Sequence, residues 1–349
     1  MANYKYHPID LDRPGVRLLQ LSRGKRGDDI HCDLFDGWIS QVEQGIPYEA
    51  LSYTWETTEK SAQITVNGCT MQVTSNLYSA LQHLRLEAVD RVLWVDAICI
   101  NQENMEERRH QVQLMSQIYK EAERVLVWLG EGTEESDLLM DVMKQLHEIS
   151  VKIEGDWRPL AQFWFNPRAG KRNMTPEIDI WHEAMEEMLG RPWFRRIWIL
   201  QEIANARVAT IHCGECSVSA RTFAQVPSII GFQPDTHSQA VLDIMPGPSR
   251  KESWWGQNRN LLNLLIKFRG SKATDDRDMI YALLGISLDA CQSDVLFPDY
   301  KKSLQQVIQD ATSFLLSHTG AVDPSLSKFL NWTLAEFLGN LDSLSSSIL

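Results

Sequence analysis

The sequence predicts an α/β protein with a mostly parallel sheet flanked by helices, and three observations support this. Short apolar runs alternate with amphipathic helical segments between residues 48 and 213, which is typical of a doubly wound fold. Two of the runs, residues 91–100 and 125–129, are almost continuously apolar, as expected for strands covered on both faces. The 349 residues are 44% hydrophobic and 23% charged, which is enough for one large or two ordinary domains.

Residues 1–47 are expected to form a pair of strands packed on the core. Residues 14–21 and 30–35 have strand-like patterns, and a Gly-containing turn separates them. Residues 64–73 predict a hairpin that turns at Asn67 and Gly68. Thr74 or Ser75 is expected to cap the helix that follows, residues 76–86.

The central domain is expected to span residues 48–220, with a helical insertion at about residues 131–190. Helices are predicted at 106–122, at 181–189 and from Arg191 to about Ala206, and a strand at 208–213. Residues 221–322 are expected to complete the domain as a helical extension, with helices at 261–268, 278–284 and 303–318. Residues 323–349 form a Ser-rich tail.

The charge and the absence of long apolar runs exclude several partners. The net charge of −12 argues against binding to nucleic acid or to an anionic membrane, since both need a basic surface. No apolar run approaches a membrane span, and the first ten residues lack the pattern of a signal peptide. Six Cys in a chain of this length are no disulfide framework. We therefore expect a cytoplasmic protein with reduced thiols.

Four stretches of the sequence carry a family resemblance. They are YEALSYTW at 48–55, LWVDAICINQ at 93–102, RPWFRRIWILQE at 191–202, and ATDDRDMIYALLG at 273–285. In this order they resemble the heterokaryon-incompatibility (HET) domain of fungi. The one departure is Glu56, where the family usually has Gly after the Trp.

The resemblance implies a fold and an activity. HET domains resemble Toll/interleukin-receptor (TIR) domains, which have a flavodoxin-like sheet, and some TIR domains cleave NAD. In those enzymes a Glu follows a Trp by four residues, a spacing that Trp198 and Glu202 share. Residues four apart share one face of a helix, so the Trp198 ring and the Glu202 carboxylate are expected side by side.

This chemistry assigns a role to each candidate residue. Losing nicotinamide builds positive charge on the ribose, which the carboxylate of Glu202 would stabilise. Trp198 or Trp55 would supply an aromatic wall for a ring of the substrate. The remaining contacts would come from the loops beyond two strand ends and from the helix after them: Ser52, Tyr53, Asp96, Asn101 and Gln102 for ribose or amide, and Arg108 or Arg109 for pyrophosphate.

Each assignment has a structural alternative. Glu202 is otherwise a helix-surface residue or a partner of Arg195 or Arg196. The structural alternative for Asp96 is a buried acid that caps the loop of Asn101. For Asn101 and Gln102, the alternative is a role in the turn and in capping the next helix. Arg108 otherwise pairs with Glu103 or Asp96, and Trp198 otherwise packs in the core.

Three functions follow from these alternatives. The first is an NAD glycohydrolase that triggers cell death when the protein self-associates, with NAD or a related nucleotide as substrate and no cofactor. The second is a non-catalytic module that signals by homotypic assembly or through an incompatibility partner protein. The third is a nucleotide sensor without turnover. No metal site is expected, because Cys213 and Cys216 lack a second ligand pair and are interpreted as a turn between strands.

Overall fold

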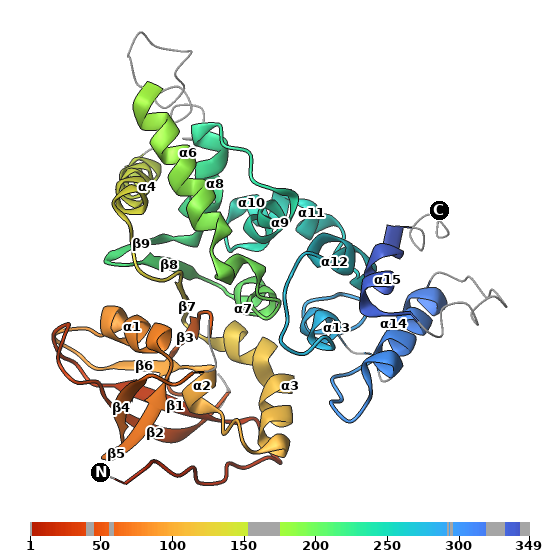
Figure 1. The fold of residues 1–349 in the computed structure, drawn as a ribbon, viewed down its shortest axis with the longest axis horizontal. Coiled ribbons are helices and arrows are strands. Elements are labelled where there is room, and N and C mark those ends of the chain that lie inside the picture. The colour runs from red at the N-terminus through yellow and green to blue at the C-terminus, as the bar shows by residue number, and fades with distance from the viewer. Residues whose placement is uncertain are drawn as a thin grey trace.

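The structure, a computed structural model, describes residues 2–39, 45–55, 59–152, 175–291, 293, 296–318 and 332–342. These residues contain a nine-stranded mixed sheet in the order β5-β4-β2-β1-β6-β3-β7-β8-β9, flanked by helices (Figure 1). The predicted α/β class is confirmed. Among the described residues, no helix combines the length and the apolarity that crossing a membrane requires.

Four parallel strands form the centre of the sheet: β6 (Arg91–Trp94), β3 (Glu49–Ser52), β7 (Arg124–Trp128) and β8 (Ala209–Cys213). Taken in chain order, these four lie side by side as second, first, third and fourth. This is the beginning of the flavodoxin-like strand order, in which the direction of winding reverses between the first and third strands. The carboxyl ends of β3 and β7 therefore flank the place where such folds bind ligands.

The expected N-terminal strand pair is present. It consists of β1 (Gly15–Leu21) and β2 (His31–Trp38), which pair antiparallel, and β1 also pairs with β6. The hairpin β4 (Ala62–Val66) and β5 (Cys69–Val73) turns at Asn67 and Gly68, whose φ values are 49° and 71°. Positive φ at both positions is the requirement of a tight hairpin turn, which explains the Asn-Gly pair. Thr74 caps α1 (Ser75–Leu84), as predicted.

The continuous strand predicted for residues 91–100 is wrong. The strand β6 ends at Trp94, and residues Asp96–Cys99 form one helical turn, α2. Ile98, Cys99 and Ile100 are nevertheless buried. Burial accounts for the apolar run, and a short buried run has no periodicity that separates a strand from a helical turn.

The long crossover from β7 to β8 holds the predicted insertion. It contains α4 (Glu134–Lys152) and α6 (Thr175–Gly190), which contact each other, and part of the expected irregular stretch, residues 153–174, lies outside the described residues. The single helix predicted from Arg191 to Ala206 is divided into a 3-10 turn, η1 (Pro192–Arg195), and α7 (Ile199–Asn205). Lys272 explains the division, because its backbone bonds to Arg195 and Ile197 between the two elements.

The helix α3 (Met105–Glu121) packs beside α7 and begins at Asn104, whose side chain accepts bonds from the backbone N–H groups of Glu106 and Glu107. Its buried side chains include Glu107, Gln111, Met115 and Ile118, at intervals of three or four residues. This spacing turns one face of the helix towards the sheet.

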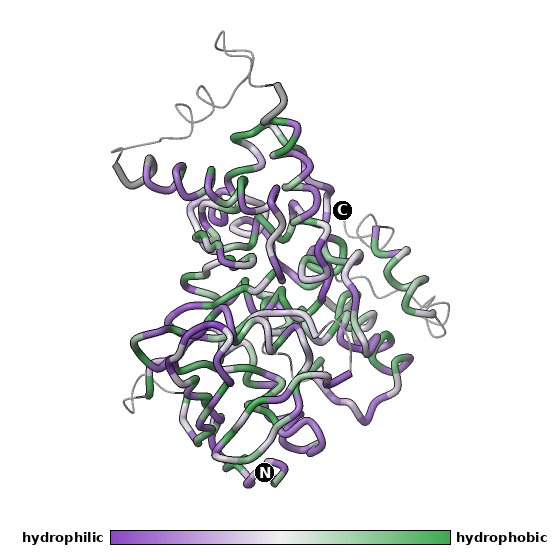
Figure 2. Tube along the Cα trace, turned by 60° about the vertical axis from the view of Figure 1, so that its left-hand side comes forward, coloured by the Kyte–Doolittle hydropathy of each residue, from purple (hydrophilic) through white to green (hydrophobic). Residues whose placement is uncertain are grey.

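The chain after β8 is mainly helical. The strand β9 (Cys216–Ser219) follows the turn predicted at Cys213 and Cys216, and helices then fill residues 220–260, where the sequence was ambiguous. The helices are α8 (Ala220–Ile230), α9 (Thr236–Ile244), α10 (Pro248–Glu252), α11 (Trp254–Gln257), α12 (Leu261–Phe268), α13 (Asp278–Leu284), α14 (Leu304–His318) and α15 (Leu334–Gly339). Hydrophilic and hydrophobic residues alternate along the outer helices (Figure 2).

Candidate functional site

A buried polar cluster lies beyond the carboxyl ends of β3 and β6. Ser52 ends β3, and Asp96 lies two residues beyond the end of β6. The segment from η1 to α7 brings Arg196 and Glu202 against them. Since β3 borders the point where the strand order reverses, the cluster lies beside the position at which this class of sheet binds ligands.

Glu202 is fully buried in this cluster. Its Oε1 accepts a bond from Nη1 of Arg196 at 3.1 Å, and its Oε2 accepts no hydrogen bond of normal geometry. Burial raises the pKa of Glu202 to about 7, although Arg196 lowers it; Asp96 raises it further, and the nearby Ser52 hydroxyl lowers it. Glu202 is therefore a carboxyl group that titrates close to neutral pH.

Arg196 holds the cluster together. Its guanidinium binds Glu202, donates to Oδ2 of Asp96 at 3.2 Å, and donates to the backbone carbonyl of Tyr53 at 2.8 Å. Burial lowers the pKa of Arg196, but the carboxylates of Glu202 and Asp96 outweigh burial and raise it. One cation thus faces two acids. Only about a fifth of the Arg196 side chain is exposed, and a tenth of the Asp96 side chain.

Aromatic residues surround the charged groups. The indole of Trp55 donates to both oxygens of Asp96, at 3.1 and 3.3 Å, and the indole of Trp193 donates to the Ser52 hydroxyl at 2.8 Å. The buried hydroxyl of Tyr53 lies near Asp96 but makes no hydrogen bond of normal geometry. Buried polar atoms without partners are destabilising, so the unpartnered oxygens of Glu202 and Tyr53 mark this cluster as a candidate functional site.

The structure thus gathers five of the nine predicted site residues: Ser52, Tyr53, Trp55, Asp96 and Glu202. Two other residues, Gln102 and Asn101, shape the loop beside it. The side-chain amide of Gln102 donates to the Asp96 carbonyl at 2.9 Å, and Asn101 accepts from the backbone of Glu103. The hydrogen bonds of both side chains therefore lie within the loop itself.

Two predicted residues contact other parts of the chain. The indole of Trp198 donates to Oδ2 of Asp278 at 3.0 Å, whereas the Glu202 carboxylate accepts from Arg196, and no bond between Trp198 and that carboxylate is recorded among the described residues. Trp198 is the N-cap residue of α7, and its ring turns towards α13 while Glu202 faces the sheet. Arg108 lies over the ring of Tyr300 at 5.8 Å, and the structure records no bond between Arg108 and the cluster among the described residues.

Arg196 and Trp193 belong to the cluster although sequence analysis did not select them. Arg196 was considered only as a competing partner of Glu202, and Trp193 was part of a motif without a role. The signal for both was the motif RPWFRRIWILQE itself, in which an Arg and a Trp lie within ten residues of the acid. Which of the two neighbouring arginines faces inwards depends on the turn at η1.

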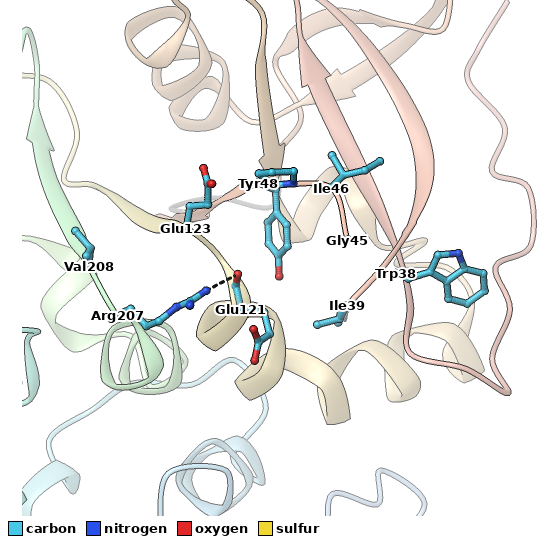
Figure 3. Close-up of a pocket in the computed structure, with 10 residues that line it drawn as sticks. Trp38, Ile39, Gly45, Ile46, Tyr48, Glu121, Glu123, Arg207 and Val208 are labelled. Carbon is cyan, nitrogen blue, oxygen red and sulfur yellow. Dashed lines mark hydrogen bonds between the residues drawn. The ribbon is translucent and has the colours of Figure 1, made fainter. Parts of the chain in front are cut away.

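Two cavities lie away from the cluster. One, of about 530 Å³, lies at the opposite edge of the sheet, where Tyr48 and Val208 precede β3 and β8 (Figure 3). Trp38, Ile46 and Val208 line it and are partly exposed, and Arg207 donates to the carbonyl of Glu121 beside it. The second cavity lies among the C-terminal helices. Arg196 and Trp55 are the partly exposed members of the buried cluster.

No set of three or more metal-ligating side chains occurs among the described residues. Cys213 and Cys216 face each other across the β8–β9 turn, and the thiol of Cys213 accepts a bond from Arg191 at 3.2 Å. The pair is therefore part of the hairpin packing.

Residues 48–202 match the profile of a family described as heterokaryon incompatibility protein (HET). The chain carries a HET domain. The match begins at Tyr48, directly before β3, and ends at Glu202, so it contains every member of the buried cluster. The strands β8 and β9 and the later helices lie beyond the matched range.

The chain is also similar to heterokaryon incompatibility protein 6, OR allele, of Neurospora crassa. The two are 27% identical over an alignment of 358 positions, and the alignment covers 86% of this chain and 51% of the relative. The chain therefore spans about half the length of the curated relative that it matches. No solved structure matches the chain.

Proposed function

We propose that this HET domain acts in heterokaryon incompatibility and programmed cell death by cleaving the nicotinamide glycosidic bond of NAD. The observation that carries the proposal is the buried carboxylate of Glu202, which has one oxygen without a hydrogen bond and a pKa near 7. Perturbed acids with unsatisfied atoms are concentrated at functional sites, because a purely structural position gains nothing from them.

The reaction needs a negative charge beside the ribose. The bond between C1′ and the nicotinamide nitrogen breaks with its electron pair leaving on nicotinamide, and the ribose becomes oxocarbenium-like. Water then adds to C1′ and releases a proton, giving ADP-ribose and nicotinamide. Ionised Glu202 stabilises the positive charge, and its proximity to Arg196 favours the ionised form.

In the proposed mechanism the site has a closed state, in which Arg196 bonds to the acids, and an open state, in which it binds the substrate. In the structure its guanidinium bonds to Glu202, to Asp96 and to the carbonyl of Tyr53. A pyrophosphate is a bidentate acceptor that replaces carboxylates well at an arginine. Substrate binding would thus release Asp96 and Tyr53 to contact ribose hydroxyls, and self-association is the proposed trigger for the opening.

A second candidate is a non-catalytic module that signals by homotypic assembly. The observation in its favour is that Arg196 neutralises Glu202 inside a site where the carboxylate has no exposed surface. In that case the three charged groups are a structural network that aligns α7 with the ends of β3 and β6.

The test measures nicotinamide release from NAD by the purified chain at high concentration, with and without a crowding agent. We compare the wild type with Glu202→Gln, which keeps the shape of the side chain, and with Glu186→Gln, an exposed acid on α6, as the matched control. Release that disappears in folded Glu202→Gln and persists in Glu186→Gln supports the proposal.

Two other outcomes would change the proposed mechanism or contradict it. Release that survives Glu202→Gln retains NAD cleavage and assigns the carboxylate role to Asp96, the other acid at Arg196. Absence of release in every assembly state contradicts NAD cleavage and favours the homotypic module.

A further inference from the structure

A large cavity lies at the far end of α7, separate from the Glu202 cluster. It has a volume of about 910 Å³ and is bounded by the end of α3, the residues that follow α7, the helices α10 and α11, and the residues that follow α13. None of the cluster residues lines it. The cavity is therefore distinct from the buried cluster.

The lining of this cavity is strongly basic. Its cationic side chains are Lys120, Arg207, Arg250, Lys251 and Arg259, against the single acid Glu121. Within the described part of the chain, none of the five cations has a carboxylate oxygen within 4.0 Å. In a protein with a net charge of −12, such a concentration of unpaired positive charge favours an anionic ligand.

Two of the arginines are held in place by an aromatic ring. The guanidinium groups of Arg250 and Arg259 lie 5.5 and 5.2 Å from the ring centre of the buried Trp255. Arg250 also donates to the carbonyls of Ala204 and Ala206 beyond the middle of α7. Burial, and then the proximity of Arg259, lower the pKa of Arg250 to about 10, so Arg250 is charged at neutral pH.

The cavity also has an apolar part, beside Arg259, whose backbone carbonyl accepts a hydrogen bond from the Leu288 N–H. Ile286 and Leu288 line this part of the cavity, and the Leu288 side chain is 62% exposed. A cavity of this volume is in the range that holds small organic ligands. A fixed pair of arginines with three further cations matches the charge of two or more phosphate groups, and the apolar wall matches an organic part.

We propose that this basic cavity binds a small molecule that carries at least two linked phosphate groups and an apolar part. The arginines beside Trp255 bind the phosphates, Lys120 and Lys251 add charge at the rim, and the organic part lies against Ile286 and Leu288. This site is independent of the proposed NAD cleavage.

The test is calorimetric titration of the whole chain with ATP, tripolyphosphate and adenosine at low ionic strength. The variant Lys120→Glu with Lys251→Glu reverses two exposed rim charges, and Lys5→Glu with Lys60→Glu changes the net charge equally at exposed positions away from the cavity. We expect the rim variant to weaken ATP binding at least ~10-fold, and the control variant to change it less than about 2-fold. Added salt should weaken binding, because the contacts are electrostatic.

The other comparisons test the phosphate contacts and the apolar contact separately. ATP that binds at least ~10-fold more tightly than tripolyphosphate, with no binding of adenosine, supports the apolar wall as well as the phosphate contacts. Equal affinity for ATP and tripolyphosphate overturns the role of the apolar wall. Equal weakening in the rim and control variants, or no binding of either phosphate compound, overturns the site. Unchanged ATP affinity in the Glu202→Gln variant supports the independence of the basic cavity from the proposed NAD cleavage.

Discussion

Arg196 is the only cation that the structure bonds to the two buried acids Glu202 and Asp96 within the described residues. Its guanidinium nitrogens lie 3.1 Å from an oxygen of Glu202 and 3.2 Å from an oxygen of Asp96. Replacing Arg196 by Met keeps much of the side-chain volume but leaves both acids without a positive partner. Removing one partner of a buried ion pair costs about 3–5 kcal/mol, since the remaining charge is uncompensated.

We expect the Arg196→Met variant to lie at the lower end of this range, at about 3 kcal/mol, for two reasons. A fifth of the arginine side chain is exposed, and Glu202, whose pKa is about 7, becomes protonated when the arginine that lowers its pKa is removed. Urea unfolding followed by circular dichroism at pH 7 measures the change in the free energy of unfolding. The matched control is Arg195→Met, in which the lost partner is the half-exposed Asp235. A surface pair of this kind contributes up to about 1 kcal/mol.

The double variant Arg196→Met with Glu202→Gln tests whether Arg196 stabilises the fold by compensating buried negative charge. Because the neutral amide needs no cation, the double variant should be less destabilised than the sum of the single changes, with a coupling of about 1–3 kcal/mol. A loss below about 1 kcal/mol for Arg196→Met, or strict additivity in the double variant, would refute the idea that the arginine compensates buried charge.

Two other predictions concern the stability of the fold. The folded pKa of Glu202, about 7, lies above its ordinary value of 4.5, so its contribution to stability is complete below pH 4.5 and is lost as the pH rises through 7. Between pH 5 and pH 8 the free energy of unfolding should fall by up to about 3 kcal/mol from this group, and Glu202→Gln should flatten that part of the profile; an unchanged slope contradicts the assignment. Replacing Asn104 by Ala removes the cap of α3 and should cost about 1 kcal/mol in urea unfolding, whereas the exposed Asn3→Ala control should change little.

The local pattern of the sequence was sufficient for the fold class and for several boundaries. The Asn67-Gly68 turn, the cap at Thr74 and the buried strand β7 depend on residues close together in the chain, so their signals survive without tertiary information. The same holds for the polar residues placed just beyond strand ends, since the carboxyl ends of parallel strands meet at one edge. Ser52, Tyr53 and Asp96 were found for this reason.

The partners of the side chains were decided by contacts between distant segments. Glu202 faces Arg196 and the strand ends, whereas Trp198 turns to Asp278, eighty residues away, although both belong to one motif. The basic cavity likewise joins residues from four separate regions, and no local pattern relates Lys120 to Arg250.

The sequence by itself therefore determined the α/β class, the HET resemblance and the edge of the sheet where a site was expected. Only the tertiary structure decided that the run at 91–100 divides into a strand and a helical turn, and that the acid of the motif is buried against an arginine. The physical reason is that periodicity and capping act within a few residues, whereas burial, ion pairing and cavity shape depend on which distant segments pack together.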